Sequence, residues 1–355
     1  MRNWFGVKKD AAPLPSTNAV IGGNNELGIE FQHQKAERMA VPRAMMGAFV
    51  GDAVGVVLEF SKFTISEARV LAAMSYPGGG PHCVGKGQIS DDGELTIALW
   101  RALCSGEARP QAMMRVYADW LDSNPFDIGN TCYSAFNVFK HWRNGTKSKE
   151  ECIALVHTRN KESEANGALM RATAIASHVD RFHSGDIQMG LILAKQDAIL
   201  SHPSHVCVEV NQVYVYALLL LLRGTKSGEV LKKLNRYIAK KVQSKCIHSW
   251  YFKESLDISK MNCCHQMGHV RWAFVQAMYF LRHPEIRFED ALLTVLKKGG
   301  DTDTNACIVG GLVACYQEVP SHLYEPVVAF DPSQEGQDHC WRSREYSVRG
   351  VFCQE

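Results

Sequence analysis

The stretch from Arg43 to Phe60 reads RAMMGAFVGDAVGVVLEF. Its small and apolar residues recur at helical spacing, and Gly47, Gly51 and Gly55 stand four residues apart. Residues four apart lie on one face of an α-helix, and glycine has no side chain that would keep a neighbouring backbone away. The stretch therefore predicts a helix that packs closely against another helix.

The same helical spacing returns along the chain, whereas the alternating pattern of strands is almost absent. Short turns of Gly, Pro, Asn or Asp separate the helical segments, and neither a long linker nor a repeat of fixed period interrupts them. We therefore predict an all-α protein with a single compact domain, although 355 residues would also accommodate two domains. The clearest helical segments cover residues 94–104, 110–121, 133–142, 206–223, 270–282, 288–297 and 305–316.

The two ends of the chain differ from this helical domain, which we assign to residues 39–330. Residues 1–38 are rich in Asn, Gly, Pro, Ser and Gln without a helical or strand period, so we expect an extended N-terminal arm. Residues 331–355 form a polar tail that we expect to be irregular. Trp341, Tyr346 and Val351 are the candidates for docking this tail onto the domain.

Composition excludes several functions. The chain has 39 Lys and Arg against 37 Asp and Glu, and a net charge of +2 gives no basic field that would attract nucleic acid. The longest apolar run, Val213 to Leu222, is far shorter than the roughly 20 residues that cross a bilayer. Charged residues at positions 8–10 interrupt the place where a secretory signal would need a continuous apolar segment. We expect a cytoplasmic protein without nucleic-acid or membrane partners.

Two acidic clusters, GKGQISDDGELTIALW at 85–100 and KKGGDTDTNACIVGGLVAC at 297–315, precede apolar helical segments. Ser and Asp at such places are favoured helix caps, which is the simpler interpretation of each cluster alone. The second cluster offers four oxygen-bearing side chains in succession, however, and a cap needs one. Surplus carboxylate and hydroxyl oxygens suit Mg²⁺ or Mn²⁺, because converging carboxylates repel one another without a cation. Whether the two clusters meet is open at this point.

Five motifs follow one another in the order GAFVGDAVGVVLEF, GQISDDGELTIAL, DIGNTC, NGALMRATAIA and GGDTDTNA, with SHPSH between the last two. In their order and spacing they resemble the ADP-ribosylglycohydrolases, especially enzymes similar to dinitrogenase reductase-activating glycohydrolase, which remove ADP-ribose from arginine. The resemblance covers about residues 43–320. It implies an all-helical domain with two Mg²⁺ or Mn²⁺ ions in a central cleft.

The resemblance also assigns roles to single residues. It implies that Glu59, Asp92 and Asp303 are catalytic, with Glu59 as the acid or base candidate. A charged residue at a helix end is the other interpretation of Glu59, whereas Asp52 of the same motif is assigned a structural role. The metal ligands that the resemblance implies are Ser90, Asp91, Asp92, Asp301, Asp303 and Thr304.

The remaining motifs imply a substrate site. The implied substrate-binding residues are Asp127, Asn130, Asn166, Gly167, Met170, His202 and His269. An ordinary turn at DIGNTC, a structural salt bridge for Arg171 and a satisfied half-buried imidazole for His202 remain alternatives. The family usually has Thr where this chain has Ser90 and Gly93, and many members have Tyr at the position of His269. Ser90 keeps the hydroxyl group that a metal ligand needs. Whether His269 stacks on the nucleotide as the Tyr ring does is open.

We expect hydrolysis of the N-glycosidic bond between ADP-ribose and arginine of an ADP-ribosylated protein, because Asp127 is suited to hold a guanidinium. Serine-linked ADP-ribose, ADP-ribose esters and a non-catalytic binding or structural role are the alternatives. Residues 1–38 carry Trp4, Phe5, Lys8 and Lys9 as candidate anchors for a partner. An enzyme with such an arm resembles immunity proteins against ADP-ribosyltransferase toxins, and an arm folded on its own domain or disordered is the other possibility.

Overall fold

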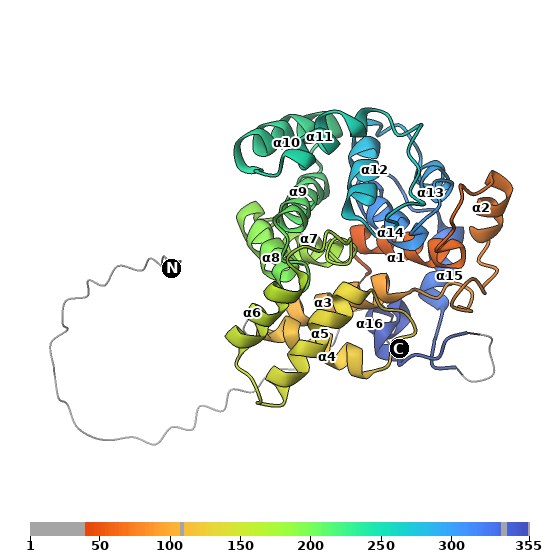
Figure 1. Ribbon diagram of the computed structural model, residues 1–355. Helices are drawn as coiled ribbons and strands as arrows, with labels where there is room; N and C mark the ends of the chain where they lie inside the picture. The colour runs from red at the N-terminus through yellow and green to blue at the C-terminus, as the bar shows by residue number, and fades with distance from the viewer. Residues whose placement is uncertain (1–39, 107–109, 335–338, 354–355) are drawn as a thin grey trace, which may run out of the picture. The chain divides into compact units, whose positions relative to one another are not determined.

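The computed structural model describes residues 40–106, 110–334 and 339–353 (Figure 1). The first half of this part contains α1 (Arg43–Gly55), η1 (Val56–Leu58), α2 (Glu67–Ala73), α3 (Asp91–Cys104), α4 (Gln111–Asp122), α5 (Asn130–Arg143), α6 (Lys149–Asn160), α7 (Thr173–Phe182) and α8 (Ile187–Ile199). The second half contains α9 (His205–Leu222), α10 (Ser227–Lys241), α11 (Lys245–Phe252), η2 (Glu254–Leu256), α12 (Val270–Arg282), α13 (Phe288–Leu296), α14 (Thr302–Val313), α15 (Ser321–Ala329), η3 (Arg344–Tyr346) and α16 (Val348–Phe352).

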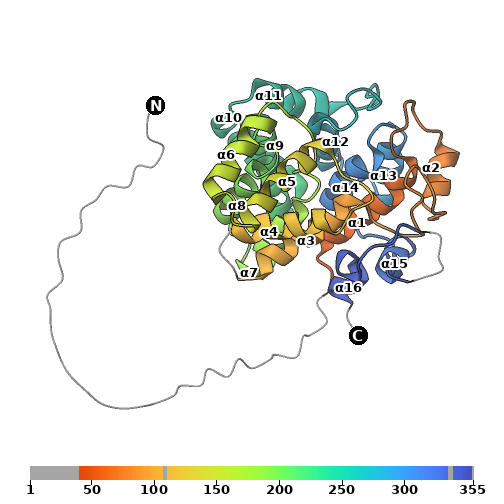
Figure 2. The ribbon, with the colours of Figure 1, turned by 60° about the horizontal axis from the view of Figure 1, so that its bottom comes forward.

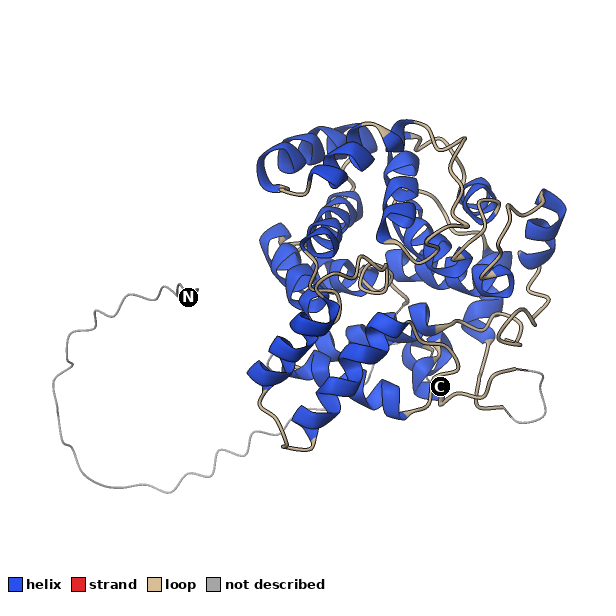
Figure 3. Cartoon of the chain, in the orientation of Figure 1, coloured by secondary structure: helices blue, strands red, loops and turns tan. Residues whose placement is uncertain are grey.

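Regular structure in these residues is helical throughout, and Figure 3 accordingly shows helices joined by loops. Extended backbone pairs only at isolated bridges, of which Ser61 with Gly300 and Ala165 with His269 matter for the site. The prediction of an all-α protein is confirmed.

The packing of α1 on α14 is the closest helix contact described here, and the two helices lie side by side in both ribbon views (Figures 1 and 2). A Cβ atom on Gly51 would lie 2.1 Å from the backbone oxygen of Ala306, well inside van der Waals contact. A Cβ atom on Gly55 would lie 2.4 Å from Cα of Asp303. The close helix contact that the glycine spacing predicted is therefore present. The partner helix, α14, carries the second acidic cluster.

The most apolar helix, α9, belongs to the core. Its 18 residues are long and apolar enough to cross a membrane, but 72% of them are buried inside the molecule. A mostly buried helix of this kind is common in the cores of water-soluble domains. Tyr214 of α9 donates a hydrogen bond to the backbone oxygen of Ile308 at 2.6 Å, which joins this helix to α14.

The tail differs in part from the expectation of irregular structure, because η3 and α16 form within it. Trp341 does not dock, since 64% of its surface is exposed, whereas Tyr346 is buried. The residue that anchors the tail is Arg342, whose buried guanidinium bonds to both carboxylate oxygens of Glu94 at 2.8 and 2.7 Å. Of the three expected docking residues, Tyr346 is buried and Val351 packs against the core, whereas the ion pair between Arg342 and Glu94 was not expected.

We predict that Gly51→Ala lowers the free energy of unfolding by about 1 to 3 kcal/mol, because the added methyl group must push α1 and α14 apart. Urea denaturation followed by circular dichroism measures this change. Gly228→Ala in α10 is the matched control, since its Cβ would meet no atom within 4 Å. Alanine there should stabilise the helix by a few tenths of a kcal/mol. Equal stability of Gly51→Ala and wild type would contradict the close helix contact.

Candidate metal centre and substrate cleft

Asp52 of α1 holds the start of α3 in place. Its buried carboxylate accepts hydrogen bonds from the backbone nitrogens of Ser90 and Gly93 at 3.0 and 2.9 Å, and from the Ser90 hydroxyl at 2.8 Å. Burial raises the pKa of Asp52 to about 7, although these hydrogen bonds act in the opposite direction. The geometry agrees with a structural role for Asp52.

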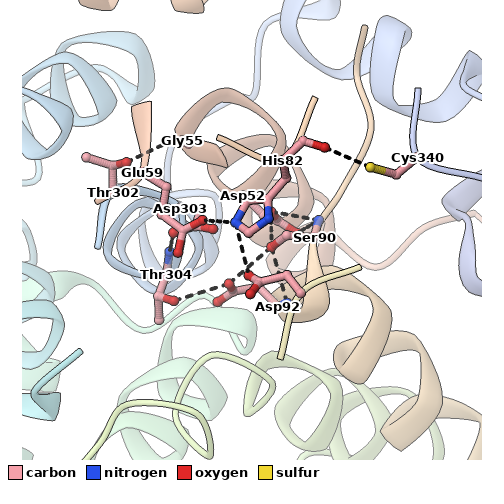
Figure 4. A network of polar contacts seen from close by, with 11 residues as sticks. Asp52, Gly55, Glu59, His82, Ser90, Asp92, Thr302, Asp303, Thr304 and Cys340 are labelled. Atoms are coloured by element: carbon pink, nitrogen blue, oxygen red, sulfur yellow. Dashed lines mark hydrogen bonds and ion pairs between the residues drawn. The ribbon is translucent and has the colours of Figure 1, made fainter. Parts of the chain in front are cut away.

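The two acidic clusters meet. Thr304 at the start of α14 donates a hydrogen bond to Asp92 at the start of α3 at 3.2 Å, across 212 positions of sequence (Figure 4). Carboxylate oxygens of Asp52, Asp92 and Asp303 lie within 4.8 Å of one another. Glu59, Asp301 and Asp303 form a second group at the same separation. These two groups share Asp303, so one buried carboxylate links both.

Helix capping explains only part of these clusters. The Ser90 side chain does cap α3, but the Asp301 side chain makes no capping bond to α14. One carboxylate oxygen on each of Asp92, Asp301 and Asp303 is buried without a hydrogen-bond partner in the described part of the chain. Buried acceptors without partners are costly, and a bound cation satisfies several at once.

The pKa values of the clustered carboxylates also favour a bound cation. Burial, followed by the neighbouring carboxylates, raises the pKa values of Asp91, Asp92 and Asp303 well above their ordinary range. A divalent cation would reverse this effect, because positive charge stabilises the ionised form. The oxygen-only donor set fits Mg²⁺ or Mn²⁺, which prefer carboxylate and hydroxyl ligands.

The six implied ligands occupy different depths. Asp91, Asp301 and Thr304 line a cleft of about 590 Å³, whereas Asp92 and Asp303 are buried beneath it. Ser90 is also buried and directs its hydroxyl to Asp52. The residues lining the cleft are Glu59, Phe60, Asp91, residues 127–132, residues 164–167, Met170, His202, residues 266–269, Asp301 and Thr304.

His82 is a site residue that the sequence motifs did not reveal. Its Nε2 atom lies 2.9 Å from Glu59 (Figure 4). The same atom lies 3.8 Å from Asp127, so His82 is close to two carboxylates of the site. The hydrogen bond with Glu59 raises the pKa of His82. Burial raises the pKa of Glu59 to about 7, while the His82 hydrogen bond lowers it. His82 follows the Gly-rich turn at 78–80, and that turn was the one available sequence signal.

The tail fixes the loop that carries His82. The Cys340 thiol contacts the backbone oxygen of His82 at 2.8 Å (Figure 4), and the Gln88 side chain donates to the backbone oxygen of Cys340 at 2.7 Å. Residues that are more than 250 positions apart are therefore held together here. The position of His82 depends on tertiary contacts that local sequence does not encode.

The predicted substrate residues all line the same cleft. Asn166 is nevertheless also part of the acidic centre, because its side-chain nitrogen donates to Asp301 at 2.7 Å. His269 caps α12 by accepting from the Arg271 backbone at 3.1 Å, and its Nε2 lies 3.2 Å from Glu164. These roles of Asn166 and His269 in positioning other groups were not expected from the motifs.

Arg171 forms a buried salt bridge, which was one of the two interpretations of this residue. Its guanidinium is fully buried and pairs with Asp197 at 3.0 Å. It also donates to the backbone oxygen of Gly167 at 2.9 Å. Arg171 therefore supports the cleft wall from behind and does not face the cleft itself.

The fold and the site together define a helical protein with a cleft beside buried carboxylates, which form groups that could hold a metal ion. The sequence profile of the ADP-ribosylglycohydrolase family matches residues 34–343, and the chain belongs to that family.

Similar proteins agree with this assignment. A protein of Acanthamoeba polyphaga mimivirus, named "Putative ADP-ribosyl glycohydrolase L543", is 28% identical over 316 residues, covering 83% of this chain and 93% of that protein. The ADP-ribosyl-[dinitrogen reductase] glycohydrolase of Rhodospirillum rubrum is 27% identical over 285 residues, covering 78% and 86%. A solved structure titled ADP-ribosylglycohydrolase-related protein complex shares the fold, with a TM-score of 0.64, 20% identity, and coverage of 88% and 98%.

We predict that in the presence of a chelator the protein becomes less stable as pH rises from about 4 towards about 7. Between these values the folded chain keeps protons on its buried carboxylates that the unfolded chain has released, so rising pH favours unfolding. Mg²⁺ should raise the melting temperature, most strongly at neutral pH. Melting curves at several pH values, with EDTA or Mg²⁺, measure both effects.

Asp303→Asn is the matched variant for this prediction, since it keeps the shape of the side chain and removes its charge. Without metal it should be more stable than wild type at neutral pH by about 1 kcal/mol or more. It should also respond less to Mg²⁺. If Mg²⁺ stabilises both proteins equally, Asp303 is no part of a cation site.

Proposed function

We propose that the protein hydrolyses the N-glycosidic bond that joins ADP-ribose to an arginine side chain of a modified protein. The observation that carries this proposal is that the carboxylates of Glu59 and Asp127 lie close together at the cleft, both near Nε2 of His82. Both carboxylates line the cleft, at distances of 2.9 and 3.8 Å from that nitrogen. A carboxylate that faces the cleft can hold a guanidinium through charge-assisted hydrogen bonds, often two in parallel.

Arginine linkage fits this pair better than the alternatives. A serine-linked or ester-linked ADP-ribose brings no positive charge, so Asp127 would gain no charge-assisted hydrogen bond from the leaving group. Guanidine leaves readily only while it remains protonated, and a facing carboxylate favours that state. A non-catalytic role is disfavoured because the acidic centre is retained in full.

In this proposal the cations bind the ribose and the attacking water. Two Mg²⁺ or Mn²⁺ ions, when bound, would supply positive charge for the ribose hydroxyls and a water of lowered pKa. We assign their binding to the side chains of Asp91, Asp92, Asp301, Asp303 and Thr304. Asp92, Asp301 and Asp303 belong to the close carboxylate groups, and Asp91 and Thr304 line the cleft. Ser90, the sixth predicted ligand, donates its hydroxyl to Asp52.

Glu59 is the proposed acid and base. Its carboxyl group lies at the cleft and its pKa, raised by burial to about 7, suits both acceptance and donation of a proton near neutral pH. His82 orients this carboxyl group through the 2.9 Å hydrogen bond. Asp127 would hold the departing guanidinium, and Asn130 lies in the same segment of the cleft wall.

We predict that Asp127→Asn lowers kcat/KM for ADP-ribosyl-arginine by about 30-fold or more, because the guanidinium loses its charged partner. Binding of free ADP-ribose and of Mn²⁺ should change little, as both calorimetric titrations would show. Asp119→Asn is the control, since it removes an equal charge from the salt bridge with Arg143 on the surface. Faster cleavage of serine-linked than of arginine-linked substrate by the wild-type protein would contradict the assignment.

A further part of the proposal is that the enzyme acts in the cytoplasm, and that residues 1–38 bind an ADP-ribosyltransferase toxin and confer immunity. These residues lie outside the described part of the chain. Deleting them should leave hydrolysis of ADP-ribosyl-arginine intact and abolish binding to a cognate transferase in a pull-down assay. Undiminished transferase binding by the truncated protein would refute the immunity role.

A further inference from the structure

A chain of buried polar groups stands behind the cleft wall, away from the acidic centre. It runs from Tyr117 through Asp197 and Arg171 to Ser201 and His202. All five side chains are buried. Only the last of them, His202, lines the cleft.

The hydrogen bonds of this chain have a direction. Asp197 accepts from the Tyr117 hydroxyl, and from Nε of Arg171 at 3.0 Å. A terminal nitrogen of Arg171 then donates to the Ser201 hydroxyl oxygen at 2.8 Å. That oxygen lies 2.8 Å from Nδ1 of His202. A guanidinium has donors only, so the Ser201 oxygen must act as the acceptor towards Arg171.

The Ser201 hydroxyl then needs an acceptor for its own proton. Among the described residues, Nδ1 of His202 is the acceptor within hydrogen-bonding distance of this hydroxyl. If Nδ1 carried a proton itself, the serine proton would be buried without a partner, which is costly. Nδ1 is therefore the acceptor, and in a neutral imidazole the ring proton then sits on Nε2.

Nε2 is the free polar atom of His202, a residue that lines the cleft. It is buried without a hydrogen bond in the described part of the chain. Gly167 leaves room beside it, because a Cβ atom on Gly167 would lie 3.2 Å from Nε2. The ring stays uncharged, since burial and the charge of Arg171 lower the pKa of His202 to about 3.

We propose that Arg171 and Ser201 lock His202 as the neutral tautomer with the proton on Nε2, which presents a fixed hydrogen-bond donor to an acceptor oxygen of the ligand. The identity of that ligand as ADP-ribose rests on the proposed function. Ser201 and Arg171 are thus positioning residues, and His202 is the group that touches the ligand.

The two sides of the cleft then differ in the groups that they can bind. The acidic side, with Glu59 and Asp127, attracts donors and positive charge. His202 offers a donor, so its partner is a ribose hydroxyl or a phosphate oxygen and not the guanidinium.

The tautomer is measured first, in the ligand-free protein, with ring-nitrogen NMR of ¹⁵N-histidine-labelled samples. The His202→Gln spectrum identifies the signals of His202 among the 14 histidines of the chain. We expect a protonated Nε2 and an unprotonated Nδ1 near neutral pH. In Ser201→Ala the lock is absent, so a mixture of tautomers should appear. This readout does not depend on what the enzyme hydrolyses.

Binding is measured next by calorimetry with ADP-ribose, ADP and ribose 5-phosphate. Ser201→Ala and His202→Asn should weaken ADP-ribose binding roughly tenfold, the size expected for one lost hydrogen bond. His202→Gln should retain more affinity than His202→Asn, because its amide nitrogen reaches the position of Nε2. Ser204→Ala, in the same segment but outside the residues that line the cleft, is the control.

The ligands separate the two possible oxygen sources. A loss confined to ADP-ribose and ribose 5-phosphate assigns the acceptor to the terminal ribose, and an equal loss with ADP assigns it to the ADP part of the ligand. A protonated Nδ1 in the wild-type protein, or unchanged ligand binding by folded Ser201→Ala and His202→Asn, would overturn the proposal. Thermal melting of each variant shows whether it is folded.

Discussion

The close backbone contact between α1 and α14 is the constraint on which the site depends. Side chains are missing from one face of α1 at Gly47, Gly51 and Gly55, so α14 approaches until Gly55 faces the backbone of Asp303. The Thr302 hydroxyl then bonds to the backbone oxygen of Gly55 at 2.8 Å. Since α1 also carries Asp52, which holds the start of α3, one helix sets the positions of both acidic clusters. The separation of the carboxylates in the two acidic clusters thus follows from helix packing.

Burying the carboxylates of the two acidic clusters lowers the stability of the fold. The helix starts at α3 and α14 favour negative charge through the helix dipole, but burial and mutual repulsion raise the pKa values of Asp92 and Asp303. Oxygen atoms without partners remain on both residues. A molecule optimised for stability alone would not bury carboxylates in this way. A cation-binding centre is the simplest reason for the sequence to keep them.

Features encoded in local sequence could be predicted, and features created by long-range contacts could not. The glycine spacing of α1 predicted a close helix contact, and the motifs predicted which segments line the cleft. His82 was missed because its place depends on Glu59 and on a contact with Cys340 far along the chain. The anchoring of the tail by Arg342 was missed for the same reason, since its partner Glu94 lies 248 positions away. Spacing reveals a helix face, but it does not reveal which distant residue will meet that face.

The central claim is that the two acidic clusters form one centre for two divalent cations. Mn²⁺ titration followed by electron paramagnetic resonance tests it most directly, because two ions held close together are magnetically coupled and give a spectrum unlike that of isolated Mn²⁺. The account predicts two Mn²⁺ ions per wild-type chain with a coupled spectrum, and loss of that coupling in Asp303→Asn. Isolated Mn²⁺ alone in the wild-type protein, or full hydrolytic activity in excess chelator, would contradict it.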